Sequence, residues 1–96
     1  MYVTVRRYEG VTNPTEAGRL VNEGFLAIIS NVPGFVAYYL VDAGGGVAIA
    51  TSIFENQSGA EESTKRAADY VREKMASLLP KPPQITAGEV IAHKTK

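Results

Sequence analysis

The stretch Pro33–Asn56 contains the densest run of hydrophobic residues in the chain and predicts a long β-hairpin. A strand over residues 35–41, a turn over 42–46 and a return strand over 47–55 are rich in Val, Ile, Tyr and Phe, and the turn carries three glycines. The first arm is apolar on both faces. Because such a strand needs cover on both sides, we expect helices on one face and a second subunit on the other.

The return arm differs between its two faces. One face carries the bulky residues Val47, Ile49, Thr51 and Ile53, and the other carries Ala48, Ala50, Ser52 and Phe54. A row of small residues either admits a helix closely or leaves a hollow. An even loop pairs this row with Phe35, Ala37 and Tyr39, and an odd loop pairs it with Val36, Tyr38 and Leu40. The sequence leaves the register open, and therefore also which tyrosine faces a pocket.

A strand over residues 2–9 precedes the hairpin, and its neighbouring Arg6 and Arg7 must lie on opposite faces. At least one side of the strand must therefore meet water or an anion near its end. We expect a solvated strand end there, with Arg6 or Tyr8 near the rim of any pocket. A helix then starts at Asn13, a capping residue, and ends near Pro33. Gly24 lies in the middle of its apolar stripe, which indicates either close packing of the helix on the sheet, for example over a tyrosine ring, or room for a ligand.

The second half of the chain predicts a helix over residues 59–79, opened by a capping box of Ser58 and Glu61, and a final strand over residues 85–94. The resulting β-α-β-β-α-β order is that of a ferredoxin-like α+β fold. We expect one domain over residues 1–96, with a four-stranded antiparallel sheet and both helices on one face. The helix-free face is apolar and predicts a homodimer that forms an α/β barrel.

Composition narrows the function classes. Ten basic and ten acidic residues balance, so no net charge attracts nucleic acid or an anionic membrane, and no stretch is long and apolar enough to span a bilayer. The chain has no cysteine and one histidine, which argues against a metal site built from protein ligands. We expect a cytoplasmic protein without nucleic-acid or membrane partners.

Three motifs resemble those of the antibiotic-biosynthesis-monooxygenase-like dimeric α/β-barrel proteins, especially small stand-alone members of that superfamily. They are PGFVAYYL after the first helix, SIFEN at the end of the third strand and GAEES at the start of the second helix. The resemblance covers the whole chain. It implies a homodimer with a pocket between sheet and helices in each subunit. Active relatives oxidise aromatic polyphenols or haem with molecular oxygen, often without metal or flavin, so we expect no cofactor.

The residues typical of haem degradation are missing. Haem-degrading relatives have an asparagine on the first strand, a tryptophan at the end of the third and a histidine on the second helix. The corresponding positions here are Arg6 and Phe54, and the second helix contains no histidine. Haem degradation is therefore not expected.

Two functions fit these features. One is a homodimer of unassigned activity that binds a small aromatic or apolar ligand and lacks an intact catalytic set. The other is a cofactor-independent monooxygenase acting on an aromatic polyphenol, an oxidoreductase for which we assign no catalytic residue. The candidate pocket residues are Arg6, Asn22, Gly24, Tyr38, Tyr39, Ser52 and Phe54. Each also has a structural interpretation: core or interface for the aromatic residues, solvent exposure for Asn22.

Overall fold

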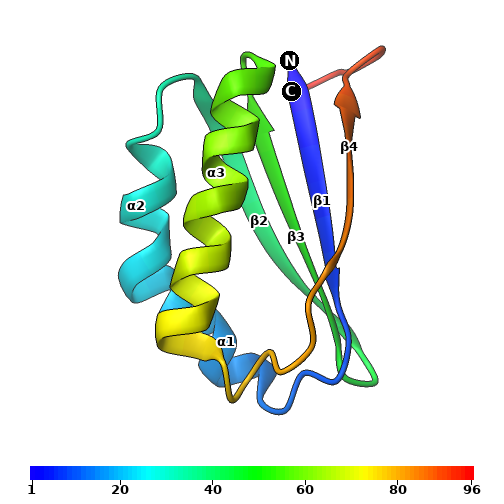
Figure 1. Ribbon diagram of the computed structural model, residues 1–96. Helices are drawn as coiled ribbons and strands as arrows, with labels where there is room; N and C mark the ends of the chain where they lie inside the picture. The colour runs from blue at the N-terminus through cyan, green and yellow to red at the C-terminus, as the bar shows by residue number, and fades with distance from the viewer.

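The computed structural model describes residues 1–96 and confirms the ferredoxin-like order (Figure 1). The strands are β1 (Tyr2–Tyr8), β2 (Phe35–Gly44), β3 (Val47–Phe54) and β4 (Gln84–Glu89). The helical segments are α1 (Pro14–Leu20), η1 (Val21–Phe25), α2 (Leu26–Ser30), α3 (Gln57–Tyr70) and η2 (Val71–Met75). All strand pairs are antiparallel in the order β2-β3-β1-β4, and the helices lie on one face of the sheet.

The hairpin register resolves which tyrosine faces the helices. Tyr38 pairs with Ser52 and Leu40 with Ala50, so the small residues of β3 share their face with Tyr38. Tyr39 points to the opposite face and is 59% exposed. Irregular pairing at both ends of β2 lets Phe35 oppose Phe54 as well. The tight reversal uses Gly44, Gly45 and Gly46, which all have positive φ.

The first helical arm begins as predicted. The Asn13 side chain accepts a hydrogen bond from the Glu16 N–H at 3.1 Å, and Pro14 stands in the first turn. The arm then continues without a break through α1, η1 and α2. The π-helical segment η1 widens the helix in its middle.

The predicted bounds of the second helix are wrong at both ends. The capping residue is Asn56 and not Ser58, because the Asn56 Oδ1 accepts the Gly59 N–H at 2.8 Å. The helical segments end at Met75 rather than Leu79. Gly59 permits this start: a Cβ there would stand 2.7 Å from the Pro33 carbonyl oxygen and 2.8 Å from the Phe54 ring.

The final strand is shorter than predicted, because it ends at Glu89 instead of Lys94. Beyond it, the Val90 N–H donates to the Met1 carbonyl at 2.9 Å, and residues 90–96 have no regular structure. His93 lies in this exposed segment. None of the helices has the length and apolar character needed to cross a bilayer.

The two sheet faces differ in cover. The helix-covered face holds the buried core, including Phe54 and Ile29, which are fully inaccessible to solvent. We call the other face the helix-free face; on β1, β2 and β3 it carries Val3, Val5, Arg7, Ala37, Tyr39, Val41, Ile49, Thr51 and Ile53. Tyr39 and Val41 on it are 59% and 48% exposed. The chain therefore presents an apolar sheet surface to solvent.

Candidate functional site

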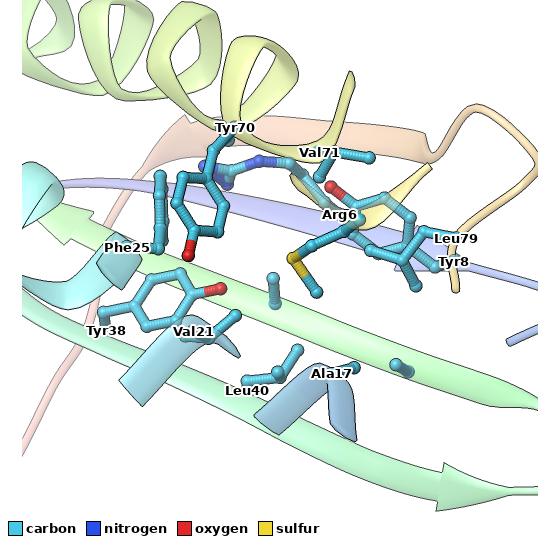
Figure 2. Close-up of a pocket in the computed structure, with 14 residues that line it drawn as sticks. Arg6, Tyr8, Ala17, Val21, Phe25, Tyr38, Leu40, Tyr70, Val71 and Leu79 are labelled. Carbon is cyan, nitrogen blue, oxygen red and sulfur yellow. The ribbon is translucent and has the colours of Figure 1, made fainter. Parts of the chain in front are cut away.

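A cavity lies between the helix-covered face of the sheet and the helical segments (Figure 2). This inner cavity has a volume of about 30 Å³, and thirteen of its fourteen lining residues are hydrophobic. They are Tyr8, Ala17, Val21, Phe25, Tyr38, Leu40, Ala48, Ala50, Ala67, Tyr70, Val71, Met75 and Leu79. The fourteenth is Arg6, the only charged group in the lining.

Each layer of the fold supplies part of this wall. Ala48 and Ala50 of β3 have small side chains, which leave space between this strand and the helical segments. The π-helical segments η1 and η2 contribute Val21 and Phe25, and Val71 and Met75. Phe25 packs against the rings of Tyr38 and Tyr70 with centroid distances of 5.5 Å and 5.4 Å. The three packed rings form one part of the cavity wall.

Arg6 is 2% exposed, so the expectation of a solvated strand end is wrong for this residue. Its Nη1 and Nη2 donate to the same Ser52 Oγ, at 3.1 and 3.2 Å. Its buried Nε has no hydrogen-bond partner, and none of the five salt bridges of the chain includes Arg6. Arg7, on the opposite face, is exposed as predicted.

Burial controls the electrostatics of the cavity. Desolvation lowers the pKa of Arg6, and the phenol groups of Tyr8 and Tyr38 act in the opposite direction. Desolvation also raises the pKa of Tyr8, and it raises the pKa of Tyr38 to about 12, although the Arg6 charge opposes both shifts. The tyrosines are therefore neutral hydroxyl groups at neutral pH. They form no hydrogen bond within the chain through those hydroxyls, which leaves both free to donate.

A larger outer cleft of about 320 Å³ adjoins the inner cavity. Arg6, Tyr8, Val71 and Leu79 line both spaces. The remaining walls of the outer cleft come from α3, η2, the proline-rich connection and β4, namely Thr64, Ala68, Arg72, Ala76, Pro80, Lys81, Pro82, Pro83 and Ile85. Arg6 thus lies where a deep apolar space meets a wider and more polar one.

The structure brings together part of the predicted site. Arg6 and Tyr38 line the inner cavity, and Ser52 is fully buried beside it as the acceptor for Arg6. Phe54 is also fully buried but packs edge-on against Phe35, with ring centroids 5.7 Å apart, and does not line the cavity.

Three predicted residues lie elsewhere. Tyr39 is on the helix-free face. Asn22 is exposed and lines a separate pocket of about 140 Å³, which shares Val21, Tyr38 and Leu40 with the wall of the inner cavity. Gly24 leaves no room for a ligand, because the Tyr70 ring fills the space in front of it. Close packing of Gly24 over a tyrosine ring is therefore confirmed, but the expected packing of helix on sheet is wrong, because the tyrosine belongs to the helix α3.

Sequence reasoning missed Phe25 and Tyr70 as cavity residues. Tyr70 belongs to the second predicted helix, which contributed no candidate pocket residue. The signal that could have found it is Gly24, since a glycine inside a buried helical stripe indicates a large group from another element.

The sequence matches no family model and no curated protein. Among solved structures, the chain is similar to a protein of unknown function from Nitrosomonas europaea, with a TM-score of 0.80, 18% identity and coverage of 99% of this chain and 93% of that one. It is also similar to a Streptomyces coelicolor monooxygenase in complex with nanaomycin D, with a TM-score of 0.72, 21% identity and coverage of 99% and 91%.

A third similar structure is a dimeric ferredoxin-like protein from an uncultured marine organism, with a TM-score of 0.69, 10% identity and coverage of 99% and 91%. At these identities the likeness establishes the fold. The chain shares its ferredoxin-like fold with these structures, which confirms the predicted fold class.

Proposed function

We propose that the protein is a homodimer that binds a small aromatic or apolar ligand between its sheet and helices. One observation carries the proposal: an apolar inner cavity and a wider, more polar outer cleft adjoin each other at Arg6, a buried cation that lines both. Ligand sites in proteins typically combine largely apolar walls with a few polar groups that fix orientation.

The volumes of the two spaces support a ligand position in the outer cleft. An inner cavity of about 30 Å³ has room for about one or two water molecules and none for an aromatic ring. The outer cleft, at about 320 Å³, falls within the range of small-molecule sites. We therefore place the body of the ligand in the outer cleft, with its end reaching Arg6 and Tyr8 at the entrance to the inner cavity.

The apolar helix-free face supports the proposed homodimer. Its apolar strands lack cover in the isolated chain, and a two-fold contact between two such faces removes the most apolar surface from water. The similarity to a dimeric ferredoxin-like protein supports this arrangement. It also leaves the ligand site accessible, because the cavity and the cleft lie on the other side of the sheet.

Cofactor-independent oxygenation of a polyphenol is the second candidate, favoured by the guanidinium of Arg6, which would stabilise a phenolate ready to react with oxygen. Such a reaction also needs a group that accepts the phenol proton. Neither space is lined by a His, Asp or Glu, and the tyrosines have raised pKa values. Binding without catalysis is therefore the better supported function.

Thermal unfolding with naphthalene derivatives, quinols and haem tests the proposal. A ligand present at 100 times its Kd stabilises the folded state by about 2.7 kcal/mol. The variant Ala68→Phe, at an exposed wall of the outer cleft, should abolish the shift, and the matched variant Ala27→Phe on exposed α2 should retain it. Unchanged melting throughout the panel would contradict ligand binding. Oxygen uptake with a bound quinol distinguishes the enzyme from the binding protein.

A further inference from the structure

Arg6 is a buried cation without a counter-ion. Its guanidinium carries five N–H donors, and the only acceptor it meets is one serine hydroxyl. Burying an unpaired charge is costly unless another group compensates it. Natural sequences retain such local conflicts mainly at functional sites, where a ligand completes the arrangement. An anion is the group that would compensate the charge of Arg6.

The other charged residues that line the outer cleft are cationic, as Arg6 is. The outer cleft is lined by three cationic residues, Arg6, Arg72 and Lys81, and by no acidic residue. Arg72 is paired with Asp69 at 2.8 Å on the exposed side of the helix, whereas Lys81 forms no salt bridge. An anion entering the cleft meets a positive rim before it reaches Arg6, and nothing in the cleft repels it.

We propose that the outer cleft binds a flat organic anion, with its oxyanion, a carboxylate or a phenolate, on Arg6. This inference rests on the function proposed above and specifies the chemistry of the ligand. The free Nε of Arg6 and the Tyr8 hydroxyl donate to the oxyanion, and Val71, Leu79 and the prolines contact the apolar body. A planar guanidinium matches the geometry of a carboxylate.

The second subunit of the proposed dimer does not supply the missing anion. Arg6 pairs with Ala50 and Ile85 on the helix-covered face, and the dimer contact uses the helix-free face. A carboxylate of the partner would therefore be separated from Arg6 by the sheet. Within the chain, no acidic side chain lines either space around Arg6.

Calorimetric titration of the full chain with three probes of the same shape tests the inference. Naphthoate, naphthamide and naphthol, substituted at the same ring position, present a carboxylate, a neutral amide and an ionisable phenol. We expect naphthoate to bind at least about tenfold more tightly than naphthamide, as a hydrogen-bonded charge pair requires. Naphthol that binds through Arg6 should show the absorption spectrum of its phenolate at a pH where the free compound is neutral.

Arg6→Met isolates the role of the cation, and Arg7→Met is the matched control on the exposed face of the same strand. Arg6→Met should lose the preference for naphthoate and leave naphthamide binding within about twofold, while Arg7→Met changes neither. Because Arg6→Met removes an uncompensated charge, the ligand-free variant should melt at a higher temperature than the wild type. A purely structural arginine would give a lower melting temperature and no change in selectivity.

Lys81→Met offers a second variant at an exposed position, which keeps the test valid if Arg6→Met does not fold. It should weaken naphthoate binding and spare naphthamide. Equal affinities of the wild type for naphthoate, naphthamide and naphthol would overturn the anion inference and leave the proposed function standing. Binding of none of the three would overturn both. Tighter binding of naphthoate than of the other two probes would identify the ligand as a carboxylate. Binding of naphthol as its phenolate, without a preference for naphthoate, would identify it as a phenol.

Discussion

Tyr70 lies directly against Gly24, so that the two helical arms touch where one of them has no side chain. The Tyr70 hydroxyl donates to the Leu20 carbonyl at 2.7 Å, and its ring carbon Cζ would stand 3.1 Å from a Cβ at position 24. The hydroxyl oxygen would be closer still, well inside van der Waals contact. This contact fixes Tyr70, and with it one wall of the inner cavity.

Gly24→Ala should therefore destabilise the protein by about 1 to 3 kcal/mol, as overpacking of a buried contact does. The direction is informative, because alanine at an unconstrained helical position is about 1 kcal/mol more favourable than glycine. Urea unfolding followed by circular dichroism measures the free energy of unfolding.

Gly18→Ala is the matched control on the same arm, since nothing lies within 4 Å of a Cβ there. It should stabilise the protein by up to about 1 kcal/mol. Adding Tyr70→Phe to Gly24→Ala should recover part of the loss, because it removes the oxygen that the new methyl group meets. A stabilising Gly24→Ala would contradict the close contact.

The capping residue of α3 gives a second prediction. Asn56→Ala should cost about 1 kcal/mol, because the Gly59 N–H loses its acceptor. Ser58→Ala should cost less, since the Ser58 hydroxyl only donates to the Asn56 Oδ1 at 2.9 Å. Urea unfolding of both variants gives the comparison, and an equal or larger loss for Ser58→Ala would restore Ser58 as the cap.

Asn56 and Ser58 show what the local sequence can and cannot predict. The strand and helix order follows from hydrophobic periodicity and was confirmed, as was the Asn13 cap. The cap of the second helix was misplaced because Asn56 and Ser58 are both good capping residues two positions apart. Contacts with Pro33 and Phe54 fix the choice, since only a helix that starts at Gln57 brings Gly59 against them.

The candidate site was also predictable only in part, because tertiary contacts decide which side chains meet. Arg6 and Tyr38 could be named from strand alternation, but the hairpin register that separates Tyr38 from Tyr39 depends on irregular pairing near Gly44 and Val36. Burial of Arg6 follows from its position on an interior strand between β3 and β4, under α3. Strand order is a tertiary property, and charge alone predicts the opposite location.

Substitutions on the helix-free face test the proposed homodimer. Ile49→Lys and Tyr39→Lys should each convert the proposed homodimer into a monomer, because a two-fold contact buries every added charge twice. Sedimentation velocity measures the change. Tyr39 is already 59% exposed in the isolated chain, so Tyr39→Lys should keep the fold. Glu73→Lys, on the exposed helical surface, is the control that should sediment as the wild type does. Dimers that survive both strand substitutions would show that another surface forms the contact.

Tyr38 predicts how stability depends on pH at the alkaline end. Burial raises its pKa from 10.0 to about 12 in the folded state. Above pH 10 the unfolded chain releases this proton while the folded chain holds it, so the stability contributed by the neutral phenol is present below pH 10 and declines up to about pH 12. The decline is at most about 1.4 kcal/mol per pH unit. Urea unfolding at several pH values measures this decline, and Tyr38→Phe should reduce the loss of unfolding free energy between pH 10 and about pH 12.

Because the Arg6 charge lowers the pKa of Tyr38, Arg6→Met should move the tyrosinate absorbance change of Tyr38 to still higher pH. A shift to lower pH in that variant would show that the guanidinium does not act on the Tyr38 hydroxyl.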